Sequence, residues 1–341
     1  MASKEGKLSN ERLGQLLKES LHPIRNDILL RPAVGEDCAA INFGDRACVV
    51  TTDPITAAEA HHGVLAVRVC LNDLASAGAT GIGLLLTILA PPETTDEEIV
   101  RIMVEAADTA RENGAEIIGG HTERTAAVNR LIVSATAIGS APKSRVISTG
   151  GAQPGDLIYM TKYAAIEGTF IGLSIEGSKP LGASDPAGAE SRCLLTELEA
   201  MLSVVPEGLA AAEAGASALH DATEGGILGA AHELCEASGV GCRIDADRIP
   251  LLDETARLAA AYRIDPLKLI ASGSMIIAIS PDRSEQLESS MRERGILLTR
   301  IGVCTEHAER TVIRSGEEKV LDPPQTDEIY RLLERTAGSC T

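Results

Sequence analysis

Aromatic side chains and positive charge are both scarce in this chain. It contains no tryptophan, two phenylalanines and four tyrosines among its 341 residues. Proteins that hold single-stranded nucleic acid stack its bases on aromatic rings, and few such rings are present here. Asp and Glu outnumber Lys and Arg by 49 to 31, which gives a formal net charge of −18. That charge repels a phosphate backbone, so nucleic acid is excluded as a partner.

Long apolar runs are also missing. The longest, GIGLLLTILA at 81–90, has about half the length needed to cross a bilayer. The first residues, MASKEGKLSNERLG, contain no apolar signal-peptide segment. The eight cysteines form no CxxC pair and no cluster with zinc-ligand spacing, a pattern typical of reduced thiols. We therefore expect a cytoplasmic protein with no membrane partner.

Three common catalytic motifs do not occur in the sequence. There is no GxxxxGK[ST] loop for phosphates, no GxGxxG that opens a helix, and no GxSxG serine elbow. His220-Asp221 is a pair suited to acid–base chemistry, but without the serine elbow it does not predict a hydrolase. We interpret His61, His62 and His232 as surface or packed residues rather than as ligands.

The residues that are present predict two α/β or α+β domains. Hydrophobic residues make up 44% of the chain, and strand-like and helix-like patterns alternate in both halves. Turn formers cluster in STGGAQPGD at 148–156, which predicts domains at 1–150 and 151–341. In the first half we expect strands at 46–52, 83–89, 115–118 and 130–139, a helix at 63–77, and a helix from the Thr95/Glu98 capping box to Gly114. In the second half we expect strands at 157–162, within 217–226, at 274–280 and at 297–303. We expect helices near 164–175, 191–202, 206–214 and 284–294, another that follows the 217–226 segment and ends at about 237, and a last one after Pro323-Pro324.

Carboxylates stand where several of these elements meet. Asp73 lies on the helix expected at 63–77, which is apolar nearly all round and so should be buried. A buried carboxylate needs a cation or an outside donor, and a hydrogen bond from a loop N–H is the simpler alternative. For Asp53 the simpler alternative is a turn residue, and for Glu36-Asp37 a solvated loop. Together, Asp37, Asp53 and Asp73 favour Mg²⁺, which takes a few carboxylates and leaves room for phosphate oxygens.

Two glycine pairs could bring backbone N–H groups close to a phosphate. Gly119-Gly120 follows an expected strand, and Gly225-Gly226 opens an expected helix. An ordinary turn is the alternative for both pairs. The residue patterns alone therefore predict a magnesium–phosphate site and name no substrate.

The order of short motifs along the chain resembles the AIR-synthase-like superfamily over residues 33–335. These motifs are GEDCAA (35–40), TTDPI (51–55), LNDLASAGA (71–79), GGHTE (119–123), GDLIYMTK (155–162), HDATEGG (220–226), ASGSM (271–275) and IGV (301–303). The resemblance implies a two-domain subunit that forms a homodimer and binds ATP and Mg²⁺ in a cleft. It implies metal ligands at Asp37, Asp53 and Asp73, and nucleotide contacts at Asn72, Gly119, Gly120, Asp221, Thr223 and Gly225.

Within the superfamily, HDATEGG and the helix leading into LNDLASAGA are most similar to the hydrogenase-maturation branch, the HypE dehydratases. That resemblance implies ATP-dependent phosphorylation of an amide or carboxamide oxygen, dehydration of a thiocarboxamide to a thiocyanate, and another maturation protein as a partner. Alternatives are a small-molecule kinase similar to thiamine-monophosphate kinase, or a nucleotide-binding scaffold with weak catalysis.

Two residues depart from the pattern of the HypE dehydratases. A paralogue that acts on another substrate is therefore an alternative. His121, followed by Glu123, stands where the family has an acid. The family ends in Pro-Arg-Ile-Cys, whereas the cysteine here, Cys340, is penultimate.

The resemblance generates a first prediction, a homodimer formed through the first domain. Pairing two copies of the first sheet would cover the open edges of the apolar strands at 46–52 and 130–139. Light scattering at micromolar concentration should give twice the 35.6 kDa mass of one chain. The mass of a single chain would contradict this prediction.

Overall fold

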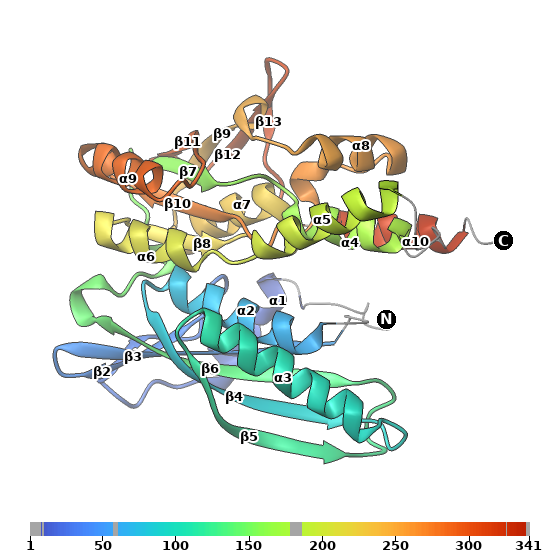
Figure 1. The fold of residues 1–341 in the computed structure, drawn as a ribbon. Coiled ribbons are helices and arrows are strands. Elements are labelled where there is room, and N and C mark those ends of the chain that lie inside the picture. Colours follow the sequence, from blue (N-terminus) through green and yellow to red (C-terminus); the bar gives the residue numbers. More distant parts are fainter. Residues whose placement is uncertain (1–7, 9, 57–60, 178–185, 325, 339–341) are drawn as a thin grey trace.

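The first half of the chain forms a six-stranded sheet covered on one face by two helices (Figure 1). The computed structural model describes residues 8, 10–56, 61–177, 186–324 and 326–338. The strand order is β1-β2-β3-β6-β4-β5. The strands are β1 (Ile28–Leu30), β2 (Ala39–Phe43), β3 (Arg46–Ile55), β4 (Thr80–Ala90), β5 (Glu116–Arg124) and β6 (Ile132–Pro142), and the helices are α1 (Asn10–Ser20), α2 (His62–Ser76) and α3 (Asp96–Glu112).

The second half forms a seven-stranded sheet in the order β13-β12-β9-β11-β7-β10-β8. Its strands are β7 (Leu157–Thr161), β8 (Ala218–Asp221), β9 (Gly241–Asp245), β10 (Met275–Ile279), β11 (Leu298–Thr305), β12 (Arg310–Arg314) and β13 (Glu317–Val320). Its helices are α4 (Ile166–Gly177), α5 (Pro186–Ala200), α6 (Val205–Ala214), α7 (Gly226–Ser238), α8 (Asp253–Tyr262), α9 (Pro281–Glu293) and α10 (Glu328–Gly338). No helix in the described part of the chain combines the length and apolar character needed to cross a membrane.

Side-chain alternation explains how the second sheet is covered on both faces. In β10, Ile276 and Ala278 pack with residues of α7, whereas Ile277 and Ile279 pack with residues of α6 and α9. All residues of β10 are buried, as expected for a strand with helices on both sides. The mixed α/β architecture predicted from the sequence is therefore confirmed.

Local sequence signals predicted helices α2 and α3 of the first half, whereas helix α1 was not predicted. The Thr95 hydroxyl accepts a hydrogen bond from the Glu98 N–H at 3.2 Å, and the Glu98 carboxylate accepts one from the Thr95 N–H at 2.8 Å. This confirms the capping box. Helix α2 covers His62–Ser76, within one residue of the predicted range at each end.

Two strands that carry predicted site residues extend well past their predicted ends. β3 runs to Ile55, so Asp53 lies inside a strand opposite Ala135 rather than in a turn. β5 runs to Arg124 beside β4, so Gly119 and Gly120 lie inside a strand, opposite Leu85 and Leu86, rather than in a loop. Gly120 has a φ of +143°, and a Cβ there would lie 1.9 Å from the Leu86 carbonyl oxygen. The pair therefore lets two strands approach closely.

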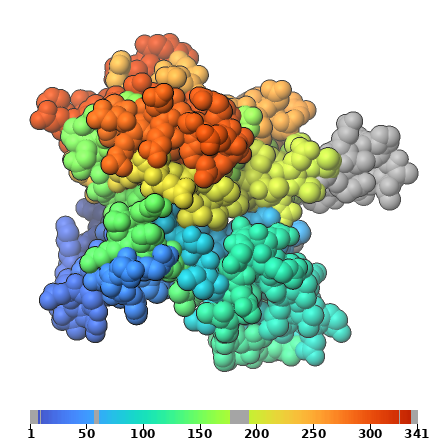
Figure 2. Space-filling view, turned by 60° about the vertical axis from the view of Figure 1, so that its left-hand side comes forward, coloured from blue at the N-terminus to red at the C-terminus, as the bar shows by residue number. Residues whose placement is uncertain are grey.

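The two halves meet through helices α2 and α6. At Gly208 in α6, an added Cβ would lie 2.4 Å from the Ala75 carbonyl oxygen of α2. Asn72, also in α2, donates from Nδ2 to the Leu202 carbonyl oxygen at 2.9 Å and accepts from the Val204 N–H at 2.8 Å. Figure 2 shows the two halves packed against each other along this contact. Because the first sheet ends at Pro142 and the second begins at Leu157, we propose that the domains divide between them, near residues 150–151.

Replacing Gly208 by valine should weaken the contact between the halves. The new side chain would collide with α2, so we expect a loss of about 1–3 kcal/mol in the free energy of unfolding, measured with urea. Gly14→Ala is the matched control, because its Cβ would make an ordinary 3.4 Å contact with Val34. Equal stability of Gly208→Val and the wild type would contradict the close packing of α2 on α6.

Candidate functional site

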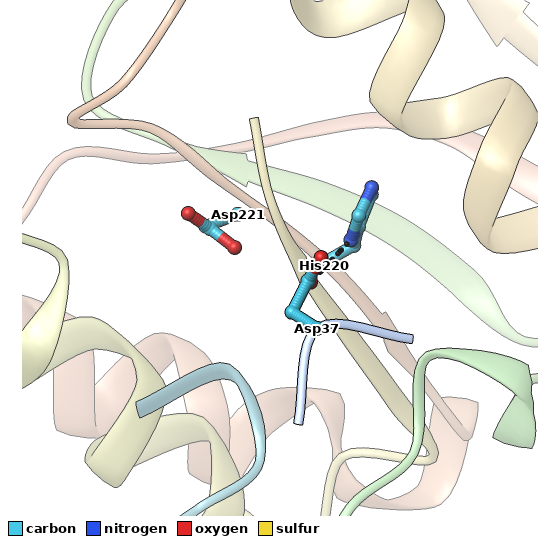
Figure 3. Close-up of side chains that lie close together, drawn as sticks. All are labelled: Asp37, His220 and Asp221. Atoms are coloured by element: carbon cyan, nitrogen blue, oxygen red, sulfur yellow. Dashed lines mark hydrogen bonds and ion pairs between the residues drawn. The ribbon is translucent and has the colours of Figure 1, made fainter. Parts of the chain in front are cut away.

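Acidic side chains from both halves converge at one place. Asp37 lies in the loop between β1 and β2, and His220 and Asp221 end strand β8. One ligand atom from each of these three residues lies within 4.8 Å of the others. Figure 3 shows the Asp37 and His220 side chains in contact, with Asp221 beside them. The structure thus brings Asp37 of the first half and Asp221 of the second half together.

Asp73 is buried beside this group. The Thr51 hydroxyl lies 2.7 Å from Asp73 Oδ2 and 3.0 Å from the Asp37 carbonyl oxygen. The donor to Asp73 is therefore a strand hydroxyl, which corrects the alternative of a loop N–H. Burial raises the pKa of Asp73 well above its ordinary value, and the charges of Asp221, Asp37 and Asp53 raise it further.

The pKa values of Asp221 and Glu36 are also raised, and burial is the main cause for both. Burial, and then the charge of Asp37, raise the pKa of Asp221 to about 7. Burial raises the pKa of Glu36 to about 7 as well, although a 2.5 Å hydrogen bond from Ser148 opposes the shift. Glu36 and Asp37 are both half-buried, so the alternative of a solvated loop is wrong.

His220 is the functional candidate that sequence reasoning left out of the site. Its Nδ1 lies 3.1 Å from Asp37 Oδ2 and its Nε2 lies 3.2 Å from Glu233 Oε2. Burial lowers its pKa, but the two carboxylates outweigh burial and raise the pKa well above the ordinary value. Both ring nitrogens contact carboxylate oxygens, which favours a protonated ring paired with Asp37 over a metal ligand. Its position next to Asp221 in HDATEGG was the available sequence signal.

This donor set fits a hard divalent cation. Four carboxyl groups, those of Asp37, Asp53, Asp73 and Asp221, act on one another electrostatically. Carboxylate oxygens are the ligands that Mg²⁺ prefers, and the protein usually supplies few of them when phosphate oxygens complete the shell. A cation would also relieve the repulsion that raises the pKa values of Asp73 and Asp221.

Four other predicted nucleotide contacts are occupied or distant within this chain. Both ends of the Asn72 amide bind the Leu202–Val204 backbone. The Gly225 N–H donates to Asp327 Oδ2 at 2.7 Å, so its left-handed φ of +85° serves the start of α7. Gly119 and Gly120 lie on β5, three strands away from β3 in the sheet, or about 14 Å at ordinary strand spacing. Thr223 lies in the β8–α7 loop, where its carbonyl oxygen accepts from the Ala271 N–H at 3.2 Å.

Comparison with known families agrees with this architecture. Residues 35–141 match the N-terminal domain of AIR synthase related proteins, and residues 153–314 match the C-terminal domain. The chain belongs to the AIR synthase related family. The superfamily predicted from the ordered motifs is thereby confirmed.

Several relatives and solved structures are similar over most of their length. A putative hydrogenase expression/formation protein of Methanocaldococcus jannaschii is 28% identical over 87% of this chain and 88% of its own. The carbamoyl dehydratase HypE of Azotobacter vinelandii is 28% identical over 82% of this chain and 80% of its own. The fold is shared with HypE in a HypE–HypF complex (TM-score 0.68, 23% identity, 85% of this chain and 94% of that one). It is also shared with a ThiL protein complexed with AMPPCP and TMP (TM-score 0.73, 18% identity, 95% and 99%).

The raised pKa of Asp221 predicts how stability changes with pH in the metal-free protein. An unfolded aspartate titrates near pH 3.9, whereas the pKa of Asp221 in the folded chain is about 7. Between these values the folded state holds a proton that the unfolded state has released, so the free energy of unfolding falls as pH rises. Asp221→Asn should remove the part of this loss that Asp221 causes, which is on the order of 2 kcal/mol in the free energy of unfolding.

Urea unfolding in EDTA at pH 5 and pH 8 measures this difference. Asp282→Asn is the control, because Asp282 is exposed on α9. The control should keep the wild-type difference between the two pH values. The same difference in Asp221→Asn would contradict the raised pKa.

Proposed function

We propose that this chain is an ATP-dependent enzyme that activates an amide, carboxamide or similar oxygen by phosphorylation. The observation that carries the proposal is the convergence of Asp37, Asp53, Asp73 and Asp221 from both halves. Such a cluster suits Mg²⁺ bound to polyphosphate. Relatives named carbamoyl dehydratase HypE support the reaction class, and a HypE structure in complex with ATP supports the nucleotide.

The acidic cluster and its neighbouring residues would have different roles in this reaction. Asp37, Asp53, Asp73 and Asp221 would hold the metal, which supplies charge neutralisation for the transferred phosphoryl group. His220 would orient Asp37 through the Nδ1 contact, and Glu233 would fix the imidazole from the other side. Thr223 follows Asp221 in the same loop and would contact the nucleotide. Strands β3 and β6 are paired on both sides within the first sheet, so the open edges predicted at 46–52 and 130–139 are wrong. The proposed homodimer is supported instead by the exposed apolar side chains Ile82, Leu85 and Ile118 of β4 and β5.

A small-molecule kinase is the second candidate. The observation that favours it is the fold shared with a ThiL protein that holds AMPPCP and TMP. A weakly catalytic scaffold is supported by the HypE–HypF complex, because that HypE binds another protein. Cys340, the residue on which a self-modifying dehydratase would depend, lies outside the described residues.

Nucleotide binding tests the site. Asp53→Asn and Asp221→Asn should each weaken Mg²⁺-ATP binding by about tenfold or more in calorimetry, because each removes a charged oxygen from the cation. Asp282→Asn, on the exposed face of α9, should bind like the wild type. Wild-type affinity in both site variants would refute the assignment.

Product analysis then separates the three activities. ADP release that depends on a carbamoyl donor and a maturation partner identifies the dehydratase type of reaction. ADP release with thiamine monophosphate alone identifies a kinase. Tight nucleotide binding without ADP release in either assay identifies a scaffold.

A further inference from the structure

Helix α3, which lies over the first sheet beside α2 (Figure 1), has apolar residues on two opposite faces. On the inner face, Ile99, Ile102 and Ala106 are buried in the core of the first half. On the outer face, Val100 and Val104 are 56% and 52% exposed. Each valine stands two positions from Ile102, which is about 200° around an α-helix. The two valines therefore project from the side of α3 that faces away from the core.

These valines belong to a longer apolar stripe. Met103 is 40% exposed, and Ala107 is exposed as well. Together with Val100 and Val104 they have the i, i+3, i+4, i+7 spacing that places residues along one side of a helix. We call these four residues the α3 stripe. A helix normally carries polar residues on the side that contacts solvent.

Folding of the chain does not account for Val100 and Val104. A β-branched side chain lowers helix propensity, because the helix restricts its χ1 angle. A side chain that stays half exposed gains little from the hydrophobic effect. Glutamine or lysine would favour the helix more at both positions. A contiguous exposed apolar stripe at helical spacing is instead typical of a surface that binds another helix.

Strong negative charge borders the α3 stripe. The 17 residues of α3 include six Asp or Glu and two Arg. Their net charge of −4 is, per residue, more than four times that of the whole chain, which carries −18 over 341 residues. An open depression of about 480 Å³ lies along Val100 and Val104, and its other lining residues are Asp96, Glu97, Arg101, Glu105 and Asp108. Four carboxylates and one guanidinium thus stand beside the apolar side chains.

We propose that the α3 stripe docks an amphipathic helix of another protein, in which lysine or arginine residues flank an aliphatic stripe. The aliphatic residues of that helix would cover Val100, Met103 and Val104. Its cations would pair with Glu97 and Asp108 at the edge of the stripe. A second copy of this chain fits less well, because pairing α3 with its copy would bring two net charges of −4 together.

The proposed homodimer uses the opposite face of the first sheet. In β4, Leu84 and Leu86 are buried in the core that α3 covers, whereas Leu85 between them is 39% exposed and points to the other face. The α3 stripe is also separate from the carboxylate cluster, so its test needs no nucleotide.

Fluorescence anisotropy with a labelled synthetic peptide tests the proposal. The peptide is helical and carries a leucine stripe flanked by lysines, and a second peptide has glutamate in place of every lysine. At about 0.15 M salt, we expect the lysine peptide to bind the full chain with a Kd on the order of 100 μM or below. The glutamate peptide should bind at least about tenfold more weakly. Absence of binding of the lysine peptide up to about 1 mM would overturn the proposal.

Variants of the stripe locate the bound peptide. Val100→Gln/Val104→Gln should weaken binding of the lysine peptide by about tenfold or more, because two apolar contacts are lost. Val320→Gln, at a 62% exposed position of β13, is the matched control and should bind like the wild type. Glu97→Gln should weaken binding by about twofold to threefold, whereas Glu285→Gln, on the exposed side of α9, should not. Equal binding by the wild type and the double valine variant would place the peptide elsewhere and overturn the proposal.

Two further measurements separate docking from a role in folding or self-association. In urea, Val100→Gln/Val104→Gln should be at least as stable as the wild type, because glutamine favours the helix. A clear loss of stability would mean that the valines serve the fold and would contradict the proposal. In light scattering, the wild type and this variant should have the same mass. A lower mass for the variant would mean that a second copy covers the stripe, which would equally overturn the proposal.

Discussion

Repulsion acting on two buried carboxyl groups is the interaction on which the candidate site depends. The charges of Asp37 and Asp53 act on Asp73 and Asp221, and burial removes the water that would screen these two residues, so that the pKa of each is raised. The Thr51 hydroxyl on Asp73 and the His220 ring on Asp37 offset part of this repulsion. A charge arrangement that opposes folding is expected where a bound cation completes it.

The same constraint makes the contact between the two halves essential. Asp53 and Asp73 come from the first sheet and its covering helix, whereas Asp221 ends a strand of the second sheet. The distances between these carboxyl groups therefore depend on how α2 packs against α6. Gly208 permits the close approach of the two helices, and Asn72 fixes the chain between α5 and α6 immediately beside Asp73. Asn72, which the resemblance assigned to nucleotide contact, thus fixes the backbone beside the carboxylate cluster.

Sequence reasoning succeeded where the cause is local. The capping box at Thr95 and the apolar faces of α2 are readable within one helix, and burial of Asp73 follows from those faces. It failed where the cause is a distant partner. No residue near Gly119-Gly120 in the sequence indicates that β4 lies alongside, so that β5 continues as a strand. No residue near His220 in the sequence indicates that Glu233 and Asp37 contact the two nitrogens of its ring. The short strands β1, β2, β9, β12 and β13 were missed because pairing, rather than propensity, defines them.

One short backbone segment between α5 and α6 is held by side chains from two other elements. Lys162 donates to the carbonyl oxygens of Met201 and Ser203, and the Asn72 amide binds the carbonyl oxygen of Leu202 and the N–H of Val204, so two side chains bind four consecutive residues. Asn72 precedes Asp73 in α2, so the position of this segment also bears on the position of the buried carboxylate.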